Sequence, residues 1–589
     1  MTSTKQKIWI FTFEYAGVIK VGGLGEVPAN QAKYLADFYE ITVFMPSHGQ
    51  VEKLKNKGEV IKLPITCQGK INSAKLGIEE SNETYNISFY KYTKENVDII
   101  LLSGNDPLTR KFLDDPTVYN PDTIKGKIGF FSLGMKFLIN SFLSKQPEIL
   151  PNAIHLHDYH VVISFYSIKQ LLEKNSIYIP SVITIHLLTW PRLGKSFYKD
   201  WGIDDTAIRV KLIDGIKYLT LDEIFSLTEE NEPSVEKIGS LICDIVTTVS
   251  QSYLNSDIIP NLGKKLIEFK SDFIWDGCDW NYDEIYKTVI KNHGEEIQEV
   301  LSLSNDIDIT KEQLKKYLLE YKLGNLSESP LISSAKVLKE INEISNGNPF
   351  IRNGRIKAFQ KSGPLILTTG RISPQKGFET IFKAIPEVIK VIPEARFLFL
   401  ILPTDYSLNE IKEYSNFVKN FPENIRIIFG VASDIFYLAH IASDVYCALS
   451  RWEPFGIMAL EAMASRVPVI ATRVGGLKET ILDIRTNPEK GTGLLINKDN
   501  ETEFAEALIS LLLTAKVAFS FKNNVKHNDL DSLISLIPEK SIKSLVLSDF
   551  SLYYKMQDNC QKRVKENFTW EIVSKKLIKI YTMIQKLNN

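Results

Sequence analysis

Short apolar runs alternate with amphipathic stretches along most of this 589-residue chain. In the first half, the apolar runs lie at residues 7–14, 40–46, 154–157, 180–186 and 245–250. In the second half, they lie at residues 365–369, 396–402, 424–429, 445–450 and 468–473. Apolar strands of this length, separated by amphipathic helices, are typical of parallel sheets covered by helices on both faces. The two series therefore predict an α/β protein with two doubly wound, Rossmann-like domains that face a deep inter-domain cleft.

The length of the chain also favours more than one domain, because a single hydrophobic core rarely extends over 589 residues. We expect an N-terminal domain over residues 1–275, a C-terminal domain over residues 276–567 and an amphipathic terminal helix over residues 568–589. Residues 325–363 are rich in Ser, Asn, Gly and Lys, and residues 519–550 lack a clear pattern. We expect irregular insertions at both places.

The composition argues against several classes of binding partner. A hydrophobic content of 44% is ordinary for a soluble enzyme, and a net charge of −1 argues against a nucleic-acid or anionic-membrane binder. No apolar run reaches about 18 residues, so no membrane-spanning helix is expected. The five cysteines have no metal-ligand spacing, and the polar start of the chain is unlike a signal peptide. We therefore expect a cytoplasmic protein with reduced thiols.

Two loops in the second half carry charged side chains directly after apolar strands. Arg371 and Lys376 follow one strand, and Glu453 follows another about eighty residues later. Since the carboxyl ends of parallel strands meet at one edge of a sheet, these groups suit a site for a nucleoside diphosphate sugar. Glu461 lies eight residues beyond Glu453 in a segment that the pattern predicts to be helical.

A glycine-rich loop follows the first strand. Gly22 and Gly23 lie between Lys20 and Glu26, at the start of a predicted helix. Glycines let backbone N–H groups approach a ligand closely, and a helix N-terminus favours an anion. The spacing of the loop fits neither a dinucleotide-binding fingerprint nor a Walker loop.

Three histidines lie within or directly after the third apolar run of the first half. Alternation along a strand places His155 and His157 on one side, which could form a metal pair, and His160 comes three residues later. No matching ligand cluster appears elsewhere, and the Asp-x-Asp sequence at residues 306–308 lies in a polar stretch that we interpret as solvated. We expect no metal site.

Taken together, and in this order, the motifs resemble those of the glycogen and starch synthases, which are retaining glycosyltransferases of the GT-B architecture. The resemblance covers nearly the whole chain apart from the two expected insertions. It implies that Glu453 contacts the hydroxyls of the transferred glucose and that His160 hydrogen-bonds the same sugar. It also implies that Arg371 and Lys376, together with Lys20, stabilise the leaving diphosphate.

The resemblance assigns further residues to the same ligands. It implies that Gly22 and Gly23 touch the donor diphosphate or the acceptor end, and that the donor-binding group also includes Phe455, Gly456, Ile457 and Glu461. Glu14, Glu26, His186 and Asp276 correspond to sugar-binding or acceptor-binding positions of the family.

The chain departs from the family pattern at a few of these positions. Asp276 stands where asparagine is usual, Leu187 follows His186 where many members have asparagine, and Glu26 replaces an aspartate. An acid near a diphosphate site is electrostatically unusual, so either Asp276 is protonated or paired with a cation, or this turn is used differently here.

The resemblance implies transfer of glucose from ADP-glucose or UDP-glucose to the non-reducing end of an α-1,4-glucan such as glycogen, with retention and without a metal or other cofactor. The sequence leaves the choice of nucleotide and association into a homo-oligomer open. One alternative is another retaining GT-B transferase that makes trehalose, sucrose or a glycolipid. A second is an inactive glucan-binding protein, since a fold does not guarantee a function.

Overall fold

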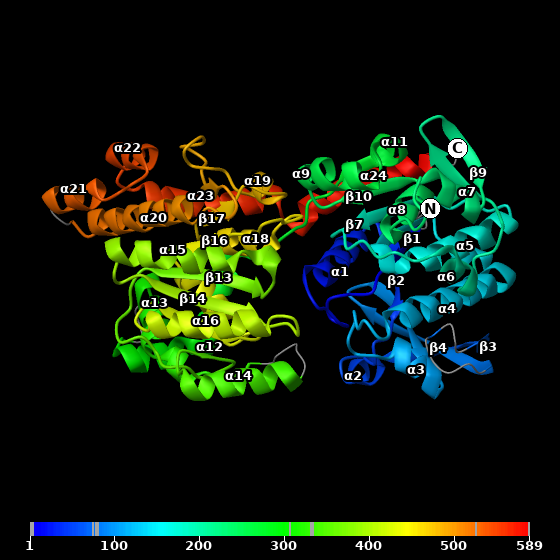
Figure 1. The fold of residues 1–589 in the computed structure, drawn as a ribbon, viewed down its shortest axis with the longest axis horizontal. Helices are drawn as coiled ribbons and strands as arrows, with labels where there is room; N and C mark the ends of the chain where they lie inside the picture. The colour runs from blue at the N-terminus through cyan, green and yellow to red at the C-terminus, as the bar shows by residue number, and fades with distance from the viewer. Residues whose placement is uncertain are drawn as a thin grey trace. The chain divides into compact units, whose positions relative to one another are not determined.

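The structure is a computed structural model that describes residues 5–72, 76, 82–304, 308–329, 335–524 and 527–586. Its contacts divide the chain into two compact units (Figure 1). Unit 1 comprises Met1–Asp276 together with Trp570–Asn589, and unit 2 comprises Gly277–Thr569. The last helix of the chain therefore belongs to the first unit.

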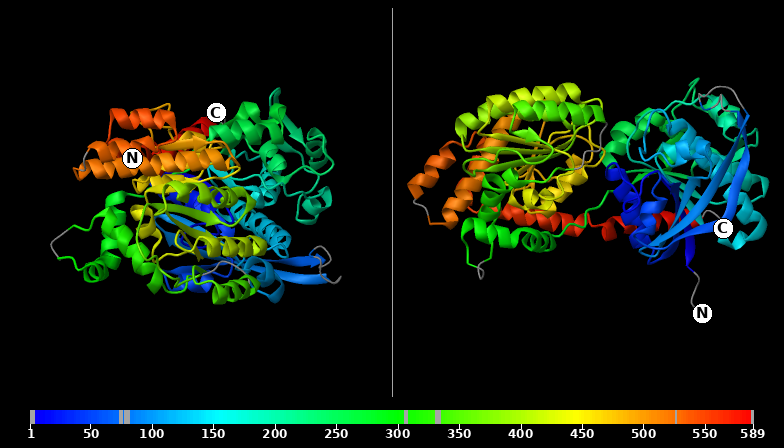
Figure 2. Two further views of the ribbon diagram at one scale, coloured as in Figure 1. Left: turned by 60° about the vertical axis from the view of Figure 1, so that its left-hand side comes forward. Right: turned by 90° about the horizontal axis from the view of Figure 1, so that it is seen from below.

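Unit 1 is built on a nine-stranded sheet with the order β11-β10-β7-β6-β1-β2-β5-β4-β3. Its strands are β1 (Gln6–Phe11), β2 (Tyr39–Pro46), β3 (Val60–Asn72), β4 (Asn82–Lys94), β5 (Val97–Gly104), β6 (Ala153–His157), β7 (Ser181–Ile185), β10 (Ile245–Thr248) and β11 (Ser271–Phe273). Strands β8 (Ile208–Leu212) and β9 (Gly215–Leu219) form a separate hairpin. Within the nine-stranded sheet, all pairs are parallel except β3 with β4 and β4 with β5, which form an antiparallel edge (Figure 2).

The helices of unit 1 connect and cover these strands. They are α1 (Gly23–Leu35), α2 (Val51–Lys55), α3 (Pro107–Leu113), α4 (Ile124–Lys145), α5 (Val162–Lys174), α6 (Lys195–Asp200), α7 (Leu221–Leu227), α8 (Val235–Ile242), α9 (Gln251–Tyr253), α10 (Ile259–Leu262), α11 (Lys264–Ile267) and α24 (Trp570–Gln585). On β1, Trp9 and Phe11 join one buried cluster, whereas Ile8 and Ile10 join another. Since successive strand residues point to opposite faces, the sheet is buried on both sides, as its apolar run predicts.

Helix α24 completes the second of these clusters. Leu577, Ile580 and Tyr581 pack there with residues of β1 and β2. The Tyr581 hydroxyl lies 2.7 Å from Nδ1 of the buried His155, and the Lys576 ammonium lies 2.8 Å from the Asp272 carboxylate. The last helix is thus fixed to unit 1 by apolar burial, a buried hydrogen bond and an ion pair.

Unit 2 is built on a seven-stranded, wholly parallel sheet with the order β12-β15-β14-β13-β16-β17-β18. Its strands are β12 (Ile351–Arg352), β13 (Leu365–Arg371), β14 (Arg396–Leu402), β15 (Ile425–Phe429), β16 (Val445–Ala448), β17 (Val469–Thr472) and β18 (Gly493–Ile496). Its helices are α12 (Tyr282–Leu301), α13 (Lys311–Glu320), α14 (Ala335–Gly347), α15 (Phe378–Val391), α16 (Leu408–Asn420), α17 (Phe436–Ala442), α18 (Ile457–Ala464), α19 (Leu477–Thr480), α20 (Glu501–Lys522), α21 (His527–Ser535), α22 (Lys540–Ser548) and α23 (Leu552–Asn567). The expected pair of doubly wound α/β units is confirmed.

The two segments that we expected to be irregular contain regular structure. Within residues 325–363, α14 is amphipathic and buries Val337 and Ile341, and β12 extends the parallel sheet by pairing with β15. Residues 519–550 hold the end of α20 and the helices α21 and α22. The expectation was wrong because polar residues on the exposed faces of these short helices obscure their apolar stripe.

One helix is longer and more apolar than the sequence reading allowed. By length and composition alone, α20 could cross a membrane, yet 67% of its apolar window is buried inside the protein. Leu508, Leu511 and Leu512 of this helix belong to the main buried cluster of unit 2. Such burial is that of a core helix in a globular unit.

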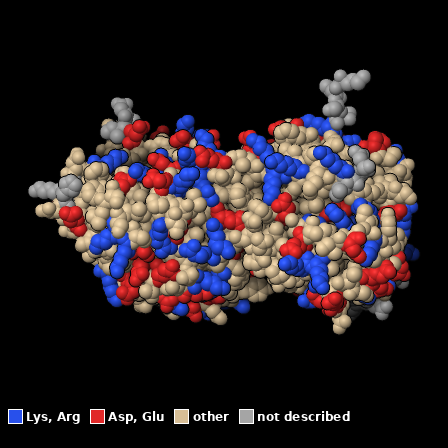
Figure 3. Space-filling view, turned by 90° about the horizontal axis from the view of Figure 1, so that it is seen from above, with Lys and Arg blue, Asp and Glu red and all other residues tan. Residues whose placement is uncertain are grey.

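The charges on the surface are mixed in sign. On the face drawn in Figure 3, lysines and arginines alternate with aspartates and glutamates over both units. The whole chain has 70 basic and 71 acidic side chains. This face thus lacks the broad basic field that a nucleic-acid surface needs.

We predict that the packing of α24 is essential to the stability of unit 1. The Leu577→Ala substitution should lower the free energy of unfolding by about 2–5 kcal/mol, because Leu577 is fully buried. Lys579→Ala, at an exposed position of the same helix, should have almost no effect. Urea unfolding followed by circular dichroism measures both, and equal effects would show that α24 does not pack as described.

Candidate functional site

The charged loops of unit 2 meet where the strand order reverses. Strand β13 lies next to both β14 and β16, and the chain proceeds from these strands to opposite sides of the sheet. Such a switch point leaves a crevice beyond the carboxyl ends of the two strands, where α/β proteins bind ligands. Lys376 follows β13 and Glu453 follows β16, so the fold brings the two motifs to this point.

A buried ion pair joins the two loops. The Lys376 ammonium lies 2.6 Å from Oε2 of Glu453, and the two side chains are only 14% and 9% exposed. The Ser450 hydroxyl donates to the same carboxylate oxygen at 2.9 Å. A carboxylate held by two donors has a fixed orientation, and removal of either charge would leave the other buried without compensation.

Arg451 also connects these two loops. Its guanidinium donates to the Pro374 carbonyl at 2.7 Å and to the Asp499 carboxylate at 2.7 Å. Its backbone N–H donates to the Gln375 carbonyl at 2.7 Å. Sequence reasoning did not assign Arg451 a role, although its place directly before Trp452 and Glu453 could have suggested one.

The next residues form the start of α18. Gly456 is its N-cap and Ile457 its first residue, with no side chain capping the helix, while the Phe455 ring is buried. Exposed amides at a helix N-terminus attract anions. Glu461 lies one turn further along α18 and is partly exposed.

The close approach of another loop fixes Glu453 from behind. The Gly476 amide donates to the Glu453 carbonyl at 3.1 Å. A Cβ atom at Gly475 would lie only 1.8 Å from that carbonyl oxygen, and Gly475 has φ +42°. Only glycine is compatible with this contact.

Arg371 is the exposed member of the unit 2 group. It is the last residue of β13, and within the described part of the chain its side chain forms no hydrogen bond or ion pair. The guanidinium therefore keeps its donors for a ligand.

Unit 1 has a switch point of its own, between β1 and β6. The glycine loop follows β1, and Glu14 shapes it. Oε2 of Glu14 accepts hydrogen bonds from the backbone N–H groups of Val21, at 2.5 Å, and Gly22, at 3.2 Å, and Oε1 accepts from the Tyr119 hydroxyl. The contacts of this carboxylate make Glu14 an organiser of the loop, and Tyr119 is a partner that sequence reasoning missed.

The two ends of the glycine loop are tied by an ion pair between Lys20 and Glu26. Between them, Gly22 precedes α1 and Gly23 begins it. A Cβ atom at Gly22 would meet nothing within 4 Å, whereas one at Gly25 would lie 2.6 Å from Cβ of Lys20. Gly25 thus serves packing, and Gly22 borders open space.

His160 follows β6 on the other side of this switch point. Its ring stacks on Tyr159 at 3.8 Å and on Phe13 at 5.2 Å between centroids. Burial lowers the pKa of His160 to about 3, so the imidazole is neutral. Its Nδ1 atom is buried without a hydrogen-bond partner among the described residues.

His186 lies at the end of the next strand, β7. Its Nε2 is 2.9 Å from Nδ1 of His157, and the two rings stack. Burial lowers the pKa of His186 to about 3. Asp276, in contrast, follows the edge strand β11, which three strands separate from β1, so the fold does not bring it to the switch point.

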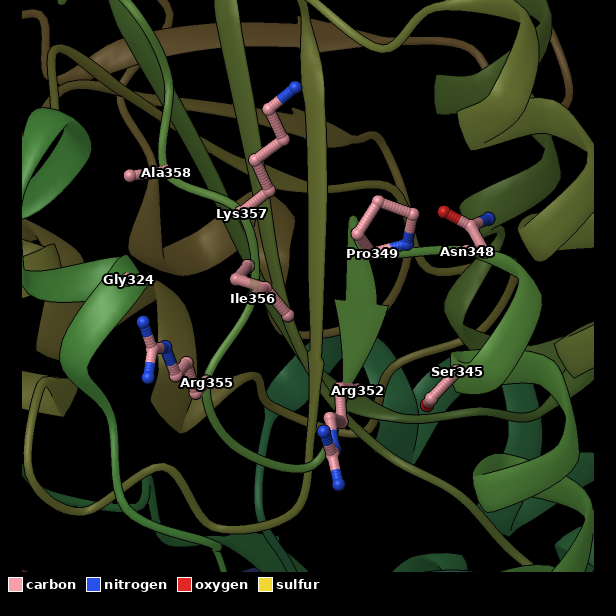
Figure 4. A pocket seen from close by; sticks show the side chains of 9 residues that line it. All are labelled: Gly324, Ser345, Asn348, Pro349, Arg352, Arg355, Ile356, Lys357 and Ala358. Atoms are coloured by element: carbon pink, nitrogen blue, oxygen red, sulfur yellow. The ribbon is translucent and has the colours of Figure 1, made fainter.

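A separate pocket of about 390 Å³ lies in unit 2 near β12. Arg352, Arg355 and Lys357 line it, but Figure 4 shows the lysine pointing away from the two arginines. None of the residues singled out from the sequence lines this pocket. Cations that diverge do not converge on one anion, so we do not assign the pocket to the site.

The described ranges contain no cluster of three or more histidine, cysteine or acidic side chains that could hold a metal ion. Residues 306 and 307 of the Asp-x-Asp sequence lie outside those ranges. All five cysteines are buried and free.

Both halves of the chain match families of known proteins. Residues 7–268 match the family described as starch synthase catalytic domain, and residues 351–528 match glycosyl transferases group 1. The chain is 24% identical over 584 residues to a glycogen synthase of Thermosipho melanesiensis, covering 98% of both chains. It is 32% identical to a probable glycogen synthase of Methanocaldococcus jannaschii over 214 residues, which is 35% of this chain and 39% of that protein.

Solved structures with the same fold include the catalytic domain of starch synthase IV from Arabidopsis thaliana, bound to ADP and acarbose. It superposes with a TM-score of 0.64 at 18% identity, over 99% of this chain and 100% of that chain. A sucrose-phosphate synthase from Thermosynechococcus elongatus superposes with a TM-score of 0.51 at 16% identity, over 98% and 99% of the two chains. Both likenesses concern the fold.

We predict that the protein loses stability as the pH falls from about 6.5 towards 3. Burial lowers the pKa of His48, His155, His160 and His186 from 6.5 to about 3, so below pH 6.5 the unfolded chain binds more protons than the fold. Each histidine contributes a slope of up to about 1.4 kcal/mol per pH unit.

Urea unfolding at several pH values measures this slope. His160→Gln should reduce the slope by up to about 1.4 kcal/mol per pH unit, because the variant lacks one of the histidines that take up a proton on unfolding. Asp158 acts in the opposite sense, because burial raises its pKa to about 8 and its contribution declines as the pH rises from 3.8 to about 8. Stability that is constant between pH 6.5 and 5 would contradict the burial of neutral histidines.

Proposed function

We propose a reaction on the premise that the chain belongs to the glycogen and starch synthase family. The protein is a hexosyltransferase of the GT-B fold that forms α-1,4-glucan. We propose that it transfers glucose from ADP-glucose or UDP-glucose to the non-reducing end of glycogen or a related glucan, with retention of configuration. The observation that carries this assignment is the pair of family matches in order along the chain, each containing a switch point with the expected motif residues.

The donor diphosphate is assigned to the switch point of unit 2. As the bond between glucose C1 and the phosphate oxygen breaks, negative charge develops on the leaving diphosphate. Arg371 and Lys376 would stabilise this charge. The uncapped amides of Gly456 and Ile457 at the start of α18 support an anion at the same place.

We propose that Glu453, the acidic residue of the loop after β16, binds the sugar. Glu453 would accept hydrogen bonds from the glucose hydroxyls, and Glu461 would support the nucleotide ribose. Oε2 of Glu453 is held by Lys376 and Ser450, which fixes the direction of the carboxylate. A carboxylate neutralised by a lysine is a weak nucleophile, so we favour attack from the face of the leaving group, with the leaving phosphate accepting the proton of the acceptor hydroxyl.

His160 is proposed to position the transferred glucose. A neutral imidazole has one N–H donor and one acceptor nitrogen, which suits hydrogen bonding to a sugar hydroxyl without adding charge. The stacked rings of Tyr159 and Phe13 fix the plane of this imidazole. Gly22 and Gly23 would face the donor or the acceptor end.

We propose that no metal or other cofactor takes part, since arginine and lysine would already neutralise the diphosphate. Five buried, free cysteines support a reducing, cytoplasmic setting.

The test is glucose incorporation into precipitable glucan by the purified protein. ADP-glucose and UDP-glucose are offered separately with glycogen as primer, with and without EDTA. We expect EDTA-resistant incorporation from at least one donor. Release of nucleoside diphosphate without incorporation would indicate a different acceptor, as in a trehalose, sucrose or glycolipid transferase. The absence of both products, with glycogen still bound, would support an inactive glucan-binding protein.

Arg371→Ala should separate function from stability. The substitution is expected to lower kcat/KM by about a hundredfold, because a donor to the developing charge is lost. The melting temperature should not change, since the side chain is exposed and makes no bond within the described ranges. Lys383→Ala, which removes another exposed cation of unit 2, is the control and should keep full activity. Activity of Arg371→Ala equal to that of the wild type would remove Arg371 from the donor site.

The glycine loop offers a second matched pair. Gly22→Ala should fold as stably as the wild type, because the added methyl group meets open space, but should reduce activity by about tenfold or more if a substrate fills that space. Gly25→Ala should instead lose about 1–3 kcal/mol of stability through its clash with Lys20. Thermal unfolding and initial rates distinguish the two effects, and a fully active Gly22→Ala protein would argue against a ligand at the loop.

A further inference from the structure

The segment that follows β7 is anchored residue by residue. Asp158, which lies in the loop after the neighbouring strand β6, accepts a hydrogen bond from the His186 amide at 2.7 Å and another from the Leu187 amide. The Leu188 amide donates to the Tyr253 hydroxyl at 2.9 Å. Asp158 and Tyr253 are both nearly fully buried, at 6% and 4% exposure.

Glu236 holds the next two residues in the same way. Its Oε1 atom accepts from the Thr189 amide at 3.0 Å, from the Thr189 hydroxyl at 3.1 Å and from the Trp190 amide at 3.1 Å. Glu236 is 1% exposed and lies in α8. Five consecutive amides are therefore bound by buried side chains, which makes this loop far more rigid than a connecting segment requires.

The residue at the end of this anchored segment is strained and exposed. Trp190 has φ +60°, a conformation that costs a bulky residue about 1–3 kcal/mol. Its side chain is nevertheless 41% exposed, so burial of the indole does not offset that cost. Strain that surrounding contacts impose without a packing gain is typical of ligand-binding positions.

The location of Trp190 connects it to the candidate site. Strands β6 and β7 pair in parallel with His157 opposite Thr184, so their following loops emerge side by side. Asp158 binds the Trp190 loop and precedes His160 by two residues. An exposed indole on an anchored loop, at the same end of the sheet as the proposed sugar-binding histidine, presents a flat apolar surface of low conformational entropy.

We propose that Trp190 stacks on a glucose ring of the α-1,4-glucan acceptor and that Glu236 is the positioning residue that holds it there. This inference rests on the proposed function, which supplies the glucan. The nearby charges are paired, Arg192 with Glu230 and Lys195 with Asp222, so the surroundings suit a neutral, polyhydroxylated ring. The C–H face of a pyranose packs on an indole while its hydroxyls stay in water.

The test combines direct binding with kinetics, using maltoheptaose as the acceptor. Trp190→Ala should raise the KM for maltoheptaose by about tenfold, with kcat and the KM for the nucleotide sugar unchanged, because the indole binds the acceptor equally in the ground and transition states. Trp190→Tyr should restore most of the affinity. Phe38→Ala removes another exposed aromatic side chain of unit 1 and should change nothing. Phe38 directly precedes β2 and so lies at the amino end of the parallel strands, whereas Trp190 lies beyond their carboxyl end.

Tryptophan fluorescence gives a readout that does not depend on turnover. Maltoheptaose should change the emission of the wild type, and Trp190→Phe should abolish that change while the other six of the seven tryptophans remain. Trp190→Gly should melt at the same or a higher temperature than the wild type, since glycine relieves the strained φ, yet bind maltoheptaose as poorly as Trp190→Ala. Improved stability with lost affinity would exclude general unfolding as the cause.

The role of Glu236 is tested by a pair of variants. Glu236→Gln keeps an oxygen that can accept from the three donors and should retain the acceptor KM, whereas Glu236→Leu should raise it towards that of Trp190→Ala. A normal acceptor KM in Glu236→Leu would overturn the positioning role.

Failure of this inference is distinguishable from failure of the proposed function. If the wild type forms glucan but Trp190→Ala keeps its KM and its fluorescence response to maltoheptaose, the inference is wrong and the function stands. If no donor supports transfer but maltoheptaose still changes the emission of Trp190, the binding site stands and the function fails.

Discussion

The reversal of strand order in a parallel sheet is the constraint on which both candidate site halves depend. In each unit two adjacent strands send the chain to opposite sides of the sheet, so the loops beyond their carboxyl ends separate and leave room between them. In unit 2 these loops contain Lys376 and Glu453. In unit 1 one of them is the glycine loop and the other contains His160. The apolar strands thus determine where chemistry can occur before any polar residue is considered.

Buried acidic side chains then fix the loops at these points. In unit 1, Glu14 organises the glycine loop, and Asp158 and Glu236 bind four of the five amides that follow β7. In unit 2, Glu453 is held by Lys376 and Ser450. The oxygen atoms of each acidic side chain replace water as the acceptor for backbone or side-chain donors. Asp158 and Glu236 are almost fully buried, and this burial raises the pKa of both side chains. Burial of these acidic side chains costs solvation free energy, but their hydrogen bonds hold the loops in one conformation before a ligand binds.

Much of this arrangement could be predicted from the sequence. All ten expected apolar strands exist, because strands buried on both faces leave an unmistakable apolar run. The four edge strands β3, β11, β12 and β18 were missed, because edge strands are often short or carry polar residues. The strands β4 and β5 and the hairpin β8–β9 were missed as well, although β5 is an apolar, buried run. The loops with Lys376, Glu453 and His160 could be found because motif residues follow the strands directly. Tyr119 and Glu236 could not, because they reach the site from distant parts of the chain and only tertiary contacts reveal them.

The central claim is that the protein extends an α-1,4-glucan with retention, and the structure of the product tests it most directly. Proton NMR of maltoheptaose after incubation with the protein and the preferred nucleotide-glucose reports the anomeric configuration and linkage of each added residue. Our account predicts new α-1,4 linkages at the non-reducing end and no other anomeric signal. A β-linked glucose, or a new linkage such as that of trehalose, would contradict it.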